Sequence, residues 1–227
     1  MKQVMDEIRQ RIHHAAVASG RPPEAVRLVA VTKTVGADRV ADAVSQGVDM
    51  VGESYIQEAR EKFDALQGLP VSWHFIGHLQ SNKAKYAVRM FDLIHSVDSF
   101  KLARELSREA EKYSKIQDIL IQVNISQEET KSGIKENAVL DLISDISALS
   151  HVRVMGLMTI PPFFDEPEKS RPVFRHLAKL KDQIMEKGIS GVHLTELSMG
   201  MTGDFEVAVS EGATLVRIGT ALFGTRQ

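Results

Sequence analysis

The feature that most constrains the fold is an alternation of short apolar runs with longer helical stretches along the chain. Eight runs have the length and the β-branched composition of buried strands, at residues 27–33, 49–53, 71–77, 92–97, 117–125, 152–158, 192–198 and 214–220. Helical periodicity lies between most of them, at residues 38–46, 54–66, 82–89, 99–112, 136–149, 168–187 and 202–211. Strands that alternate with helices of this length form right-handed βαβ units and a parallel sheet.

Eight such units predict an α/β protein with a closed (β/α)8 barrel, also called a TIM barrel. With 227 residues the chain is compact for this fold, which takes about 200 to 250 residues. The alternative is an open doubly wound sheet, but a single glycine, Gly36, follows the first run in place of a GxGxxG pattern. No linker divides the sequence. Residues 1–227 are therefore expected to form one barrel domain, with residues 1–20 as an N-terminal helix.

Composition argues against several classes of function. The formal net charge is −2 and no dense basic cluster is present, so neither nucleic acid nor an anionic membrane is an expected partner. The absence of cysteine excludes disulfides and cysteine-bound metals. His74 and His78 have helical ligand spacing but lie in a strand-to-loop context, so no metal site is expected. The sequence has no signal-peptide pattern and no run of ~18 apolar residues, which predicts a cytoplasmic protein.

Two loops near the end of the sequence carry small and hydroxyl residues. Ser198, Gly200 and Thr202 lie between the seventh run and the next helix, and Gly219 and Thr220 end the eighth run. Such residues let backbone N–H groups approach an anion, and the loops after strands 7 and 8 of a barrel frequently bind phosphate. The two loops together predict a phosphate site.

A plainer interpretation of these loops is also open. Glycine and threonine could simply make turns and caps, with Thr202 as an ordinary N-cap residue. Asp204 is expected in the first turn of the following helix, where its carboxylate would interact with the helix dipole and compete with a bound phosphate.

The first strand-like run ends on Lys33, where chemistry takes place in barrels of this kind. A nucleophilic lysine needs partial burial or a nearby cation to lower its pKa from about 10.4, and Arg217 could supply that cation. A lysine and a phosphate pocket at one barrel mouth favour a Schiff base with a phosphorylated carbonyl compound. Pyridoxal 5'-phosphate (PLP) and a sugar phosphate are both candidates. Alternatively, the lysine side chain only reaches solvent from a strand end.

Several segments resemble, in order, the pyridoxal phosphate homeostasis proteins, also called the YggS/PROSC or PLP-binding protein family. The matching segments are LVAVTKT, VGESYIQE, HFIGHLQSNK, QVNISQEETKSG, GLMTIPP and ELSMGMTGDFEVAVSEGATLVRIGTALFG, which extend over residues 28–224. The resemblance implies a fold-type III barrel similar to the N-terminal domain of alanine racemase. It also implies PLP as the cofactor.

The resemblance further implies roles for individual residues. Lys33 would form the Schiff base with PLP, and Arg217 would face the pyridine nitrogen. Because an arginine is always cationic, it would disfavour a proton on that nitrogen, and the ring would stabilise carbanions poorly. The residues implied around the phosphate are Ser198, Thr202, Gly219 and Thr220.

The chain departs from the family at Ser54, and it matches the family in a further segment of unknown role. Where the family usually reads GENYVQE, this chain reads GESYIQE, with Ser54 in place of asparagine. If the asparagine contacts the cofactor ring, Ser54 is expected to weaken the contact without abolishing the site. Ser54 could equally be the N-cap of the next helix. The matching ETKSG segment contains Lys131, to which the sequence assigns no role.

The function expected from the resemblance is to hold PLP for intracellular PLP homeostasis and delivery, with little or no catalysis. Racemases of this fold type add a β-rich domain and a tyrosine from the partner chain, whereas this chain ends at Gln227 and has only Tyr55, Tyr86 and Tyr113. One alternative is a PLP-dependent amino-acid racemase of the alanine racemase type that uses Lys33 as its sole base, and another is a Schiff-base aldolase. PLP-requiring apo-enzymes are the expected recipients, and the family suggests a monomer or weak dimer.

Overall fold

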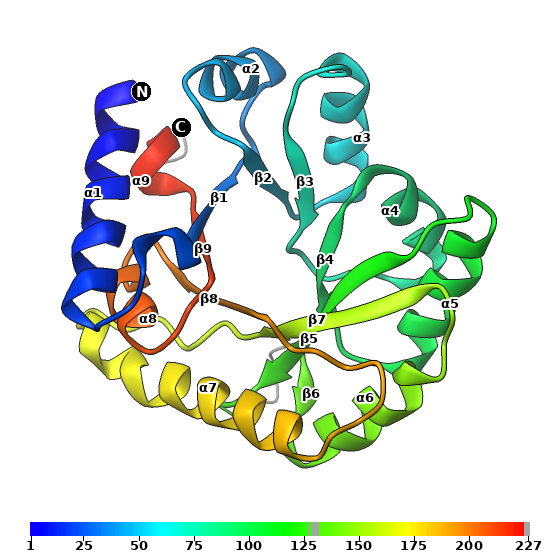
Figure 1. Cartoon of the computed structure of the whole chain (residues 1–227). Coiled ribbons are helices and arrows are strands. Elements are labelled where there is room, and N and C mark those ends of the chain that lie inside the picture. Colours follow the sequence, from blue (N-terminus) through cyan, green and yellow to red (C-terminus); the bar gives the residue numbers. More distant parts are fainter. Residues whose placement is uncertain (127, 129–131, 225–227) are drawn as a thin grey trace.

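The computed structural model describes residues 1–126, 128 and 132–224. In this part of the chain, eight parallel strands form a ring and the helices lie outside it (Figure 1). The strands of the ring are β1 (Arg27–Val31), β2 (Met50–Glu53), β3 (Ser72–Phe75), β4 (Leu93–Val97), β5 (Gln117–Asn124), β7 (Val152–Met158), β8 (Glu196–Met201) and β9 (Leu215–Ile218). A two-residue strand, β6 (Ile134–Lys135), pairs beside β5.

Strand pairing closes the sheet into a barrel. The order is β4-β3-β2-β1-β9-β8-β7-β5, and a further pairing between β4 and β5 joins the two ends. Every pair in the ring is parallel, with β1 between β2 and β9. The predicted (β/α)8 barrel is therefore confirmed. The carboxyl ends of all eight strands meet at one rim, which brings together the loops that carry the candidate residues.

Helices cover the outside of the barrel. They are α1 (Lys2–Ala18), α2 (Ala37–Ser45), α3 (Ile56–Ala65), α4 (Ala84–Met90), α5 (Phe100–Glu111), α6 (Val139–Ser147), α7 (Arg171–Glu186), α8 (Phe205–Ser210) and α9 (Thr220–Phe223). Short 3-10 turns are η1 (Pro23–Ala25), η2 (Ser81–Lys83), η3 (Glu136–Ala138) and η4 (Pro167–Ser170). Within the described residues, no helix combines the length and the apolar character that crossing a membrane requires.

Helix α5 shows how local sequence sets an element. The hydroxyl of Ser99 accepts a hydrogen bond from the backbone N–H of Leu102, which caps the N-terminus of the helix. Leu102, Leu106 and Ala110 then recur every four residues and are buried against the barrel. The helix therefore begins where its cap lies and packs through one apolar face.

The barrel has an apolar layer on each side of its wall. A large cluster of buried side chains lies between the strands and the helices. A smaller cluster consists of Val29, Leu93, Leu120, Met158 and Leu215. Because both faces of the strands are buried, the strands read as continuous apolar runs and not as alternating ones. Each fully buried side chain of leucine size contributes about 1.5–3 kcal/mol by leaving water.

The element boundaries near the seventh and eighth strands differ from the prediction. The run at residues 192–198 was predicted as a strand, but β8 covers Glu196–Met201. Val192 and Leu194 alternate with exposed neighbours as in a strand, yet pairing with β7 begins only at Glu196. The helix predicted over residues 202–211 is shorter and covers Phe205–Ser210.

Candidate functional site

Lys33 lies two residues beyond β1, at the carboxyl rim of the barrel. Its side chain is half-buried and borders a cavity of about 340 Å³. The backbone turns sharply at the next residue, since Thr34 has a φ of 64°. The predicted placement of this lysine at a strand end facing the barrel mouth is therefore observed.

The cavity beside Lys33 is formed by several strand ends. Its wall consists of Lys33, Ser54, Ile76, Gly77, His78, Gln122, Val123, Asn124, Ser132 and Ile160. Gly77 is required there, because a Cβ atom at this position would lie 2.1 Å from the backbone oxygen of Ser54. The side chain of Gln122 donates to the backbone oxygen of Ser132 (3.1 Å), which ties β5 to the following loop. The wall combines polar and apolar side chains, and most of them are uncharged.

Ser54 borders this cavity but does not cap the next helix. Helix α3 begins at Ile56, and its N-cap residue is Tyr55, without a side-chain cap. The N-cap interpretation of Ser54 is therefore wrong, and its placement beside a cofactor ring stays a prediction. Lys131, the other family position noted in the sequence, lies outside the described residues.

The two loops of the predicted phosphate site lie side by side. Strands β8 and β9 are paired, and the backbone N–H of Ala221 donates to the hydroxyl of Thr202 (3.5 Å) across the two loops. A Cβ atom at Gly219 would lie 3.3 Å from Cβ of Val31, at the end of β1. The loop after β9 therefore begins next to the strand that leads to Lys33. Thr220 is exposed at the first position of α9.

Asp204 stabilises the loop after β8. It is the N-cap residue of α8, so the N-cap interpretation of Thr202 is wrong. One carboxylate oxygen accepts from the backbone N–H of Met201 (2.7 Å) and the other from the hydroxyl of Ser170 (3.0 Å). The helices that follow the two loops have only six and four residues. Because few peptide dipoles are aligned in them, a helix dipole contributes less to this site than the sequence predicted.

Two of the predicted loop residues lie within β8. Gly200 is buried and has a φ of 90°, which a residue with a side chain rarely adopts. Ser198 is fully buried and its hydroxyl lies inside the barrel. The predicted end of this strand at Ser198 is therefore wrong, because pairing of β8 with β9 continues to Met201.

Arg217 lies on β9 and extends into the barrel interior. Its Nη1 donates to the hydroxyl of Ser198 (2.5 Å), and its Nη2 donates to the backbone oxygen of Thr159 (2.9 Å). Burial lowers the pKa of Arg217 to about 10, so the guanidinium remains a cation at neutral pH. A fixed cation is therefore present beneath the rim.

Two histidines extend this chain of hydrogen bonds through the barrel. His95 Nδ1 lies 2.8 Å from the hydroxyl of Ser198, and His95 Nε2 lies 2.9 Å from His74 Nδ1. Burial lowers the pKa of His74 to about 4 and that of His95 well below 6.5, so both rings are neutral at pH 7. A neutral imidazole has one donor and one acceptor nitrogen. The hydroxyl of Ser198 can therefore donate to His95 Nδ1, while His95 Nε2 donates to His74 Nδ1. The sequence did not predict this series of hydrogen bonds, because His74 and His95 are 21 residues apart and His95 and Ser198 are 103 residues apart.

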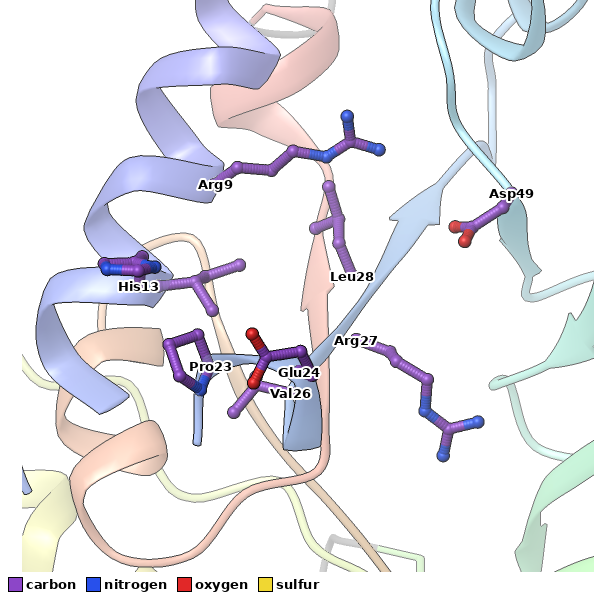
Figure 2. A pocket seen from close by; sticks show the side chains of 9 residues that line it. Arg9, His13, Pro23, Glu24, Val26, Arg27, Leu28 and Asp49 are labelled. Atoms are coloured by element: carbon purple, nitrogen blue, oxygen red, sulfur yellow. The ribbon is translucent and has the colours of Figure 1, made fainter. Parts of the chain in front are cut away.

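A second cavity, of about 300 Å³, lies at the opposite end of the barrel between α1, η1 and the start of β1 (Figure 2). Charges of both signs surround it. Arg9 donates to the backbone oxygen of Gly47 (2.6 Å), and Arg27 forms an ion pair with Glu196 (2.5 Å). These cations are engaged by the protein itself, and the cavity is remote from Lys33. In the described part of the chain, no three His, Cys, Asp or Glu side chains are arranged to hold a metal ion.

Comparison with known proteins shows the family to which the chain belongs. Residues 5–227 match the family described as alanine racemase, N-terminal domain. A pyridoxal phosphate homeostasis protein of Aquifex aeolicus is 43% identical, covering 98% of this chain and 97% of that protein. The chain belongs to the pyridoxal phosphate homeostasis protein family. The homologue of Escherichia coli (strain K12) with the same name is 38% identical, covering 97% of this chain and 94% of that protein. These relatives are named as homeostasis proteins and not as enzymes.

Solved structures place this family member among similar barrels. PipY of Synechococcus elongatus, solved with PLP bound, has a TM-score of 0.83 and 36% identity, covering 96% of this chain and 100% of that one. An alanine racemase of Clostridium difficile has a TM-score of 0.74 at 16% identity, covering 96% of this chain and 55% of that one. The second similarity shows the fold alone.

Proposed function

We propose that this chain binds PLP through Lys33 and holds it for intracellular PLP homeostasis and delivery, with little or no catalysis. The observation that carries the proposal is the position of the Lys33 amine, at the rim of a barrel and on the wall of a cavity. The names of the relatives and the PLP bound in PipY support the same cofactor.

The residues at the rim fit the parts of PLP. The amine of Lys33 would hold PLP through the aldehyde group that the cofactor supplies when bound. The loops after β8 and β9 offer hydroxyl groups and close backbone approach for the phosphate. The proposed cofactor site comprises Lys33, Ser198, Gly200, Thr202, Arg217, Gly219 and Thr220. Within this set, Ser198 acts from inside the barrel, where its hydroxyl binds Arg217.

Arg217 supports a carrier more than a catalyst. Its guanidinium keeps its charge at neutral pH and is held by Ser198 and Thr159. A cation facing the pyridine nitrogen would keep a proton off that nitrogen, and an unprotonated ring is a weak electron sink. The site therefore favours holding the cofactor over stabilising carbanions.

An amino-acid racemase would need a second base opposite Lys33. Among the described residues that line the cavity, none is a tyrosine, and the titratable side chain besides Lys33 is His78. Tyr55 is exposed beside the rim, and Tyr113 is exposed beyond the end of α5. No feature of the site therefore favours the racemase over the carrier.

Several wider features belong to the same proposal. We propose that residues 1–227 form one barrel domain, of which α1 is the N-terminal helix. We further propose a cytoplasmic protein that is a monomer or weak dimer and passes PLP to PLP-requiring apo-enzymes. Neither nucleic acid nor a membrane is a proposed partner.

Absorbance spectroscopy tests the proposed function. The purified protein with added PLP should develop the visible band of a lysine-bound cofactor, and Lys33→Ala should not. Lys85→Ala, which removes an exposed lysine of α4, is the control and should keep the band. If the parent protein stays colourless, Lys33 does not anchor PLP and a sugar-phosphate aldolase becomes the better proposal. Addition of an amino acid and analysis of its enantiomers then separate a carrier from a racemase.

A further inference from the structure

A buried cluster of opposite charges lies beside the turn that carries Lys33. Its centre is the ammonium group of Lys62 on α3, a residue only 5% exposed. Lys62 Nζ donates to Glu53 Oε1 (2.7 Å), to Glu58 Oε1 (2.6 Å) and to the backbone oxygen of Thr32 (2.5 Å). An ammonium group has three hydrogens, so the three acceptors use all of them.

The same cluster holds the residues on both sides of Lys33. On one side, the hydroxyl of Thr32 donates to Glu53 Oε1 (2.6 Å). On the other side, the backbone N–H of Thr34 donates to Glu58 Oε1 (2.5 Å). Both carboxylate oxygens also bind Lys62, so one ammonium group connects the two attachment points. The left-handed φ of 64° at Thr34 lies within this turn.

Stability alone is a poor explanation for the cluster. Removing charges from water costs free energy that a buried ion pair often does not recover, and apolar replacements of such pairs can be neutral or stabilising. In this cluster the cost of burial is not fully compensated, because Glu53 Oε2 is buried without a hydrogen-bond partner among the described residues. Backbone held in a rarely populated conformation beside a reactive group is typical of functional sites. The cluster is therefore better explained by the geometry that it imposes on residues 32–34.

We propose that Lys62 is a positioning residue for Lys33. Together with Glu53 and Glu58, it fixes the turn between Thr32 and Thr34 so that the Lys33 amine is presented to the cavity. The proposal rests on Lys33 being the PLP-binding lysine and adds the groups that hold it in place. Loss of the Lys62 ammonium would release both attachment points together.

The test compares Lys62→Met with a matched lysine elsewhere. Lys115 lies just before β5, at the opposite end of the barrel from Lys33, and it is half-buried. Its ammonium donates to the backbone oxygens of Val88 (2.9 Å) and Phe91 (2.7 Å). Lys115→Met therefore removes a half-buried ammonium that binds backbone carbonyls but has no hydrogen bond to the Lys33 turn. The measurements are the rate at which added PLP forms the visible band and the thermal midpoint of the PLP-free protein.

We expect Lys62→Met to form the band at least tenfold more slowly than the parent, and Lys115→Met to form it within about twofold of the parent rate. Both variants are expected to lower the thermal midpoint. A parental rate in Lys62→Met would overturn the proposal, and so would equal slowing in both variants, because slowing would then follow from general destabilisation.

A second variant decides the case in which Lys62→Met does not fold. Glu58 is partly exposed, so Glu58→Ala leaves less uncompensated charge while still removing the acceptor of the Thr34 N–H. Slower attachment of PLP in Glu58→Ala would support the proposal, and a parental rate would overturn it. If the parent protein itself attaches no PLP, the proposed function fails. If the parent attaches PLP and these variants do so equally fast, only the role of Lys62 fails.

Discussion

At the scale of single residues, the barrel interior holds a row of hydrogen-bonded polar groups in addition to its apolar side chains. Arg217, Ser198, His95 and His74 follow one another through hydrogen bonds of 2.5, 2.8 and 2.9 Å. Burying a guanidinium costs free energy unless its N–H groups donate hydrogen bonds. Nη1 of Arg217 donates to the hydroxyl of Ser198, and Nη2 donates to the backbone oxygen of Thr159. This series of hydrogen bonds therefore fixes the orientation of the Arg217 guanidinium, which we propose to face the pyridine nitrogen of PLP.

The neutral state of His74 has a consequence for stability. Its pKa falls from 6.5 in the unfolded chain to about 4 in the folded protein. Between these values the unfolded chain binds a proton that the folded protein does not bind, so stability is full above about pH 6.5 and declines as the pH falls toward 4. At about 1.36 kcal/mol per pKa unit, the loss from His74 is on the order of 3 kcal/mol.

Urea unfolding at several pH values checks this expectation. The free energy of unfolding of His74→Asn should fall less between pH 6.5 and pH 4 than that of the parent. His13→Asn, which changes an exposed histidine on α1, should follow the parent curve. Parallel curves for the parent and His74→Asn would contradict a depressed pKa.

Ser54 stands where the family resemblance implies asparagine, and it borders the cavity without capping α3. We expect Ser54→Asn to bind PLP about two- to tenfold more tightly, the range that one added hydrogen bond supplies. Equilibrium titration of PLP absorbance measures the change, with Ser81→Asn on η2 as a control outside the cavity wall. Unchanged or weaker binding would show that the asparagine contact does not apply here.

Single residues differed in how far the sequence could place them. Lys33 was predictable because it ends a strong apolar run, and Arg217 because a specific motif includes it. The partners of Lys62 were not predictable, because contacts with Thr32 and Glu53 depend on how α3 packs against the strands. The link between His95 and Ser198 spans 103 residues, and no local pattern signals it.

At the scale of elements, β8 and its loop depend on Gly200. Its φ of 90° is strained for any side chain, and a Cβ atom there would lie 2.5 Å from Cβ of Ala208 on α8. A separation of 2.5 Å is far shorter than a normal contact, so strand and helix would have to move apart. Gly200 therefore permits the close approach of α8 to β8.

We therefore expect Gly200→Ala to lower the free energy of unfolding by about 2 kcal/mol or more and to weaken PLP binding. Gly203→Ala is the matched control in the same loop, because a Cβ atom at Gly203 has no atom within 4 Å and its φ is not left-handed. Chemical denaturation and PLP titration measure both effects. Equal stability of the two variants would contradict the packing described for β8 and α8.

The alternation of apolar and helical runs was sufficient to predict the order and parallel direction of the elements. It was insufficient for the boundaries of β8, because the pattern at Val192 and Leu194 also suits a loop that covers the core. The sequence did not predict Asp204 as the N-cap of α8, because its carboxylate accepts hydrogen bonds from Met201 and Ser170. Only the folded loop brings Ser170 close to Asp204.

At the scale of the whole molecule, barrel closure explains how distant residues form one site. β1 pairs with β9, and β9 pairs with β8, so Lys33 and the two glycine-containing loops come from three neighbouring strands. β2, β3, β5 and β7 contribute the cavity on the other side of Lys33. Lys33 and the loops proposed to bind phosphate thus meet at one rim, although more than 160 residues separate them in sequence.

The central claim is that PLP bonds to Lys33, and the most direct measurement locates that bond. The protein is mixed with PLP, reduced with borohydride to make the bond permanent, digested and examined by mass spectrometry. The account predicts one dominant modified peptide, in which Lys33 carries the cofactor, and no such peptide from Lys33→Ala. Stoichiometric modification of another lysine, or an unmodified Lys33 in the parent, would contradict it.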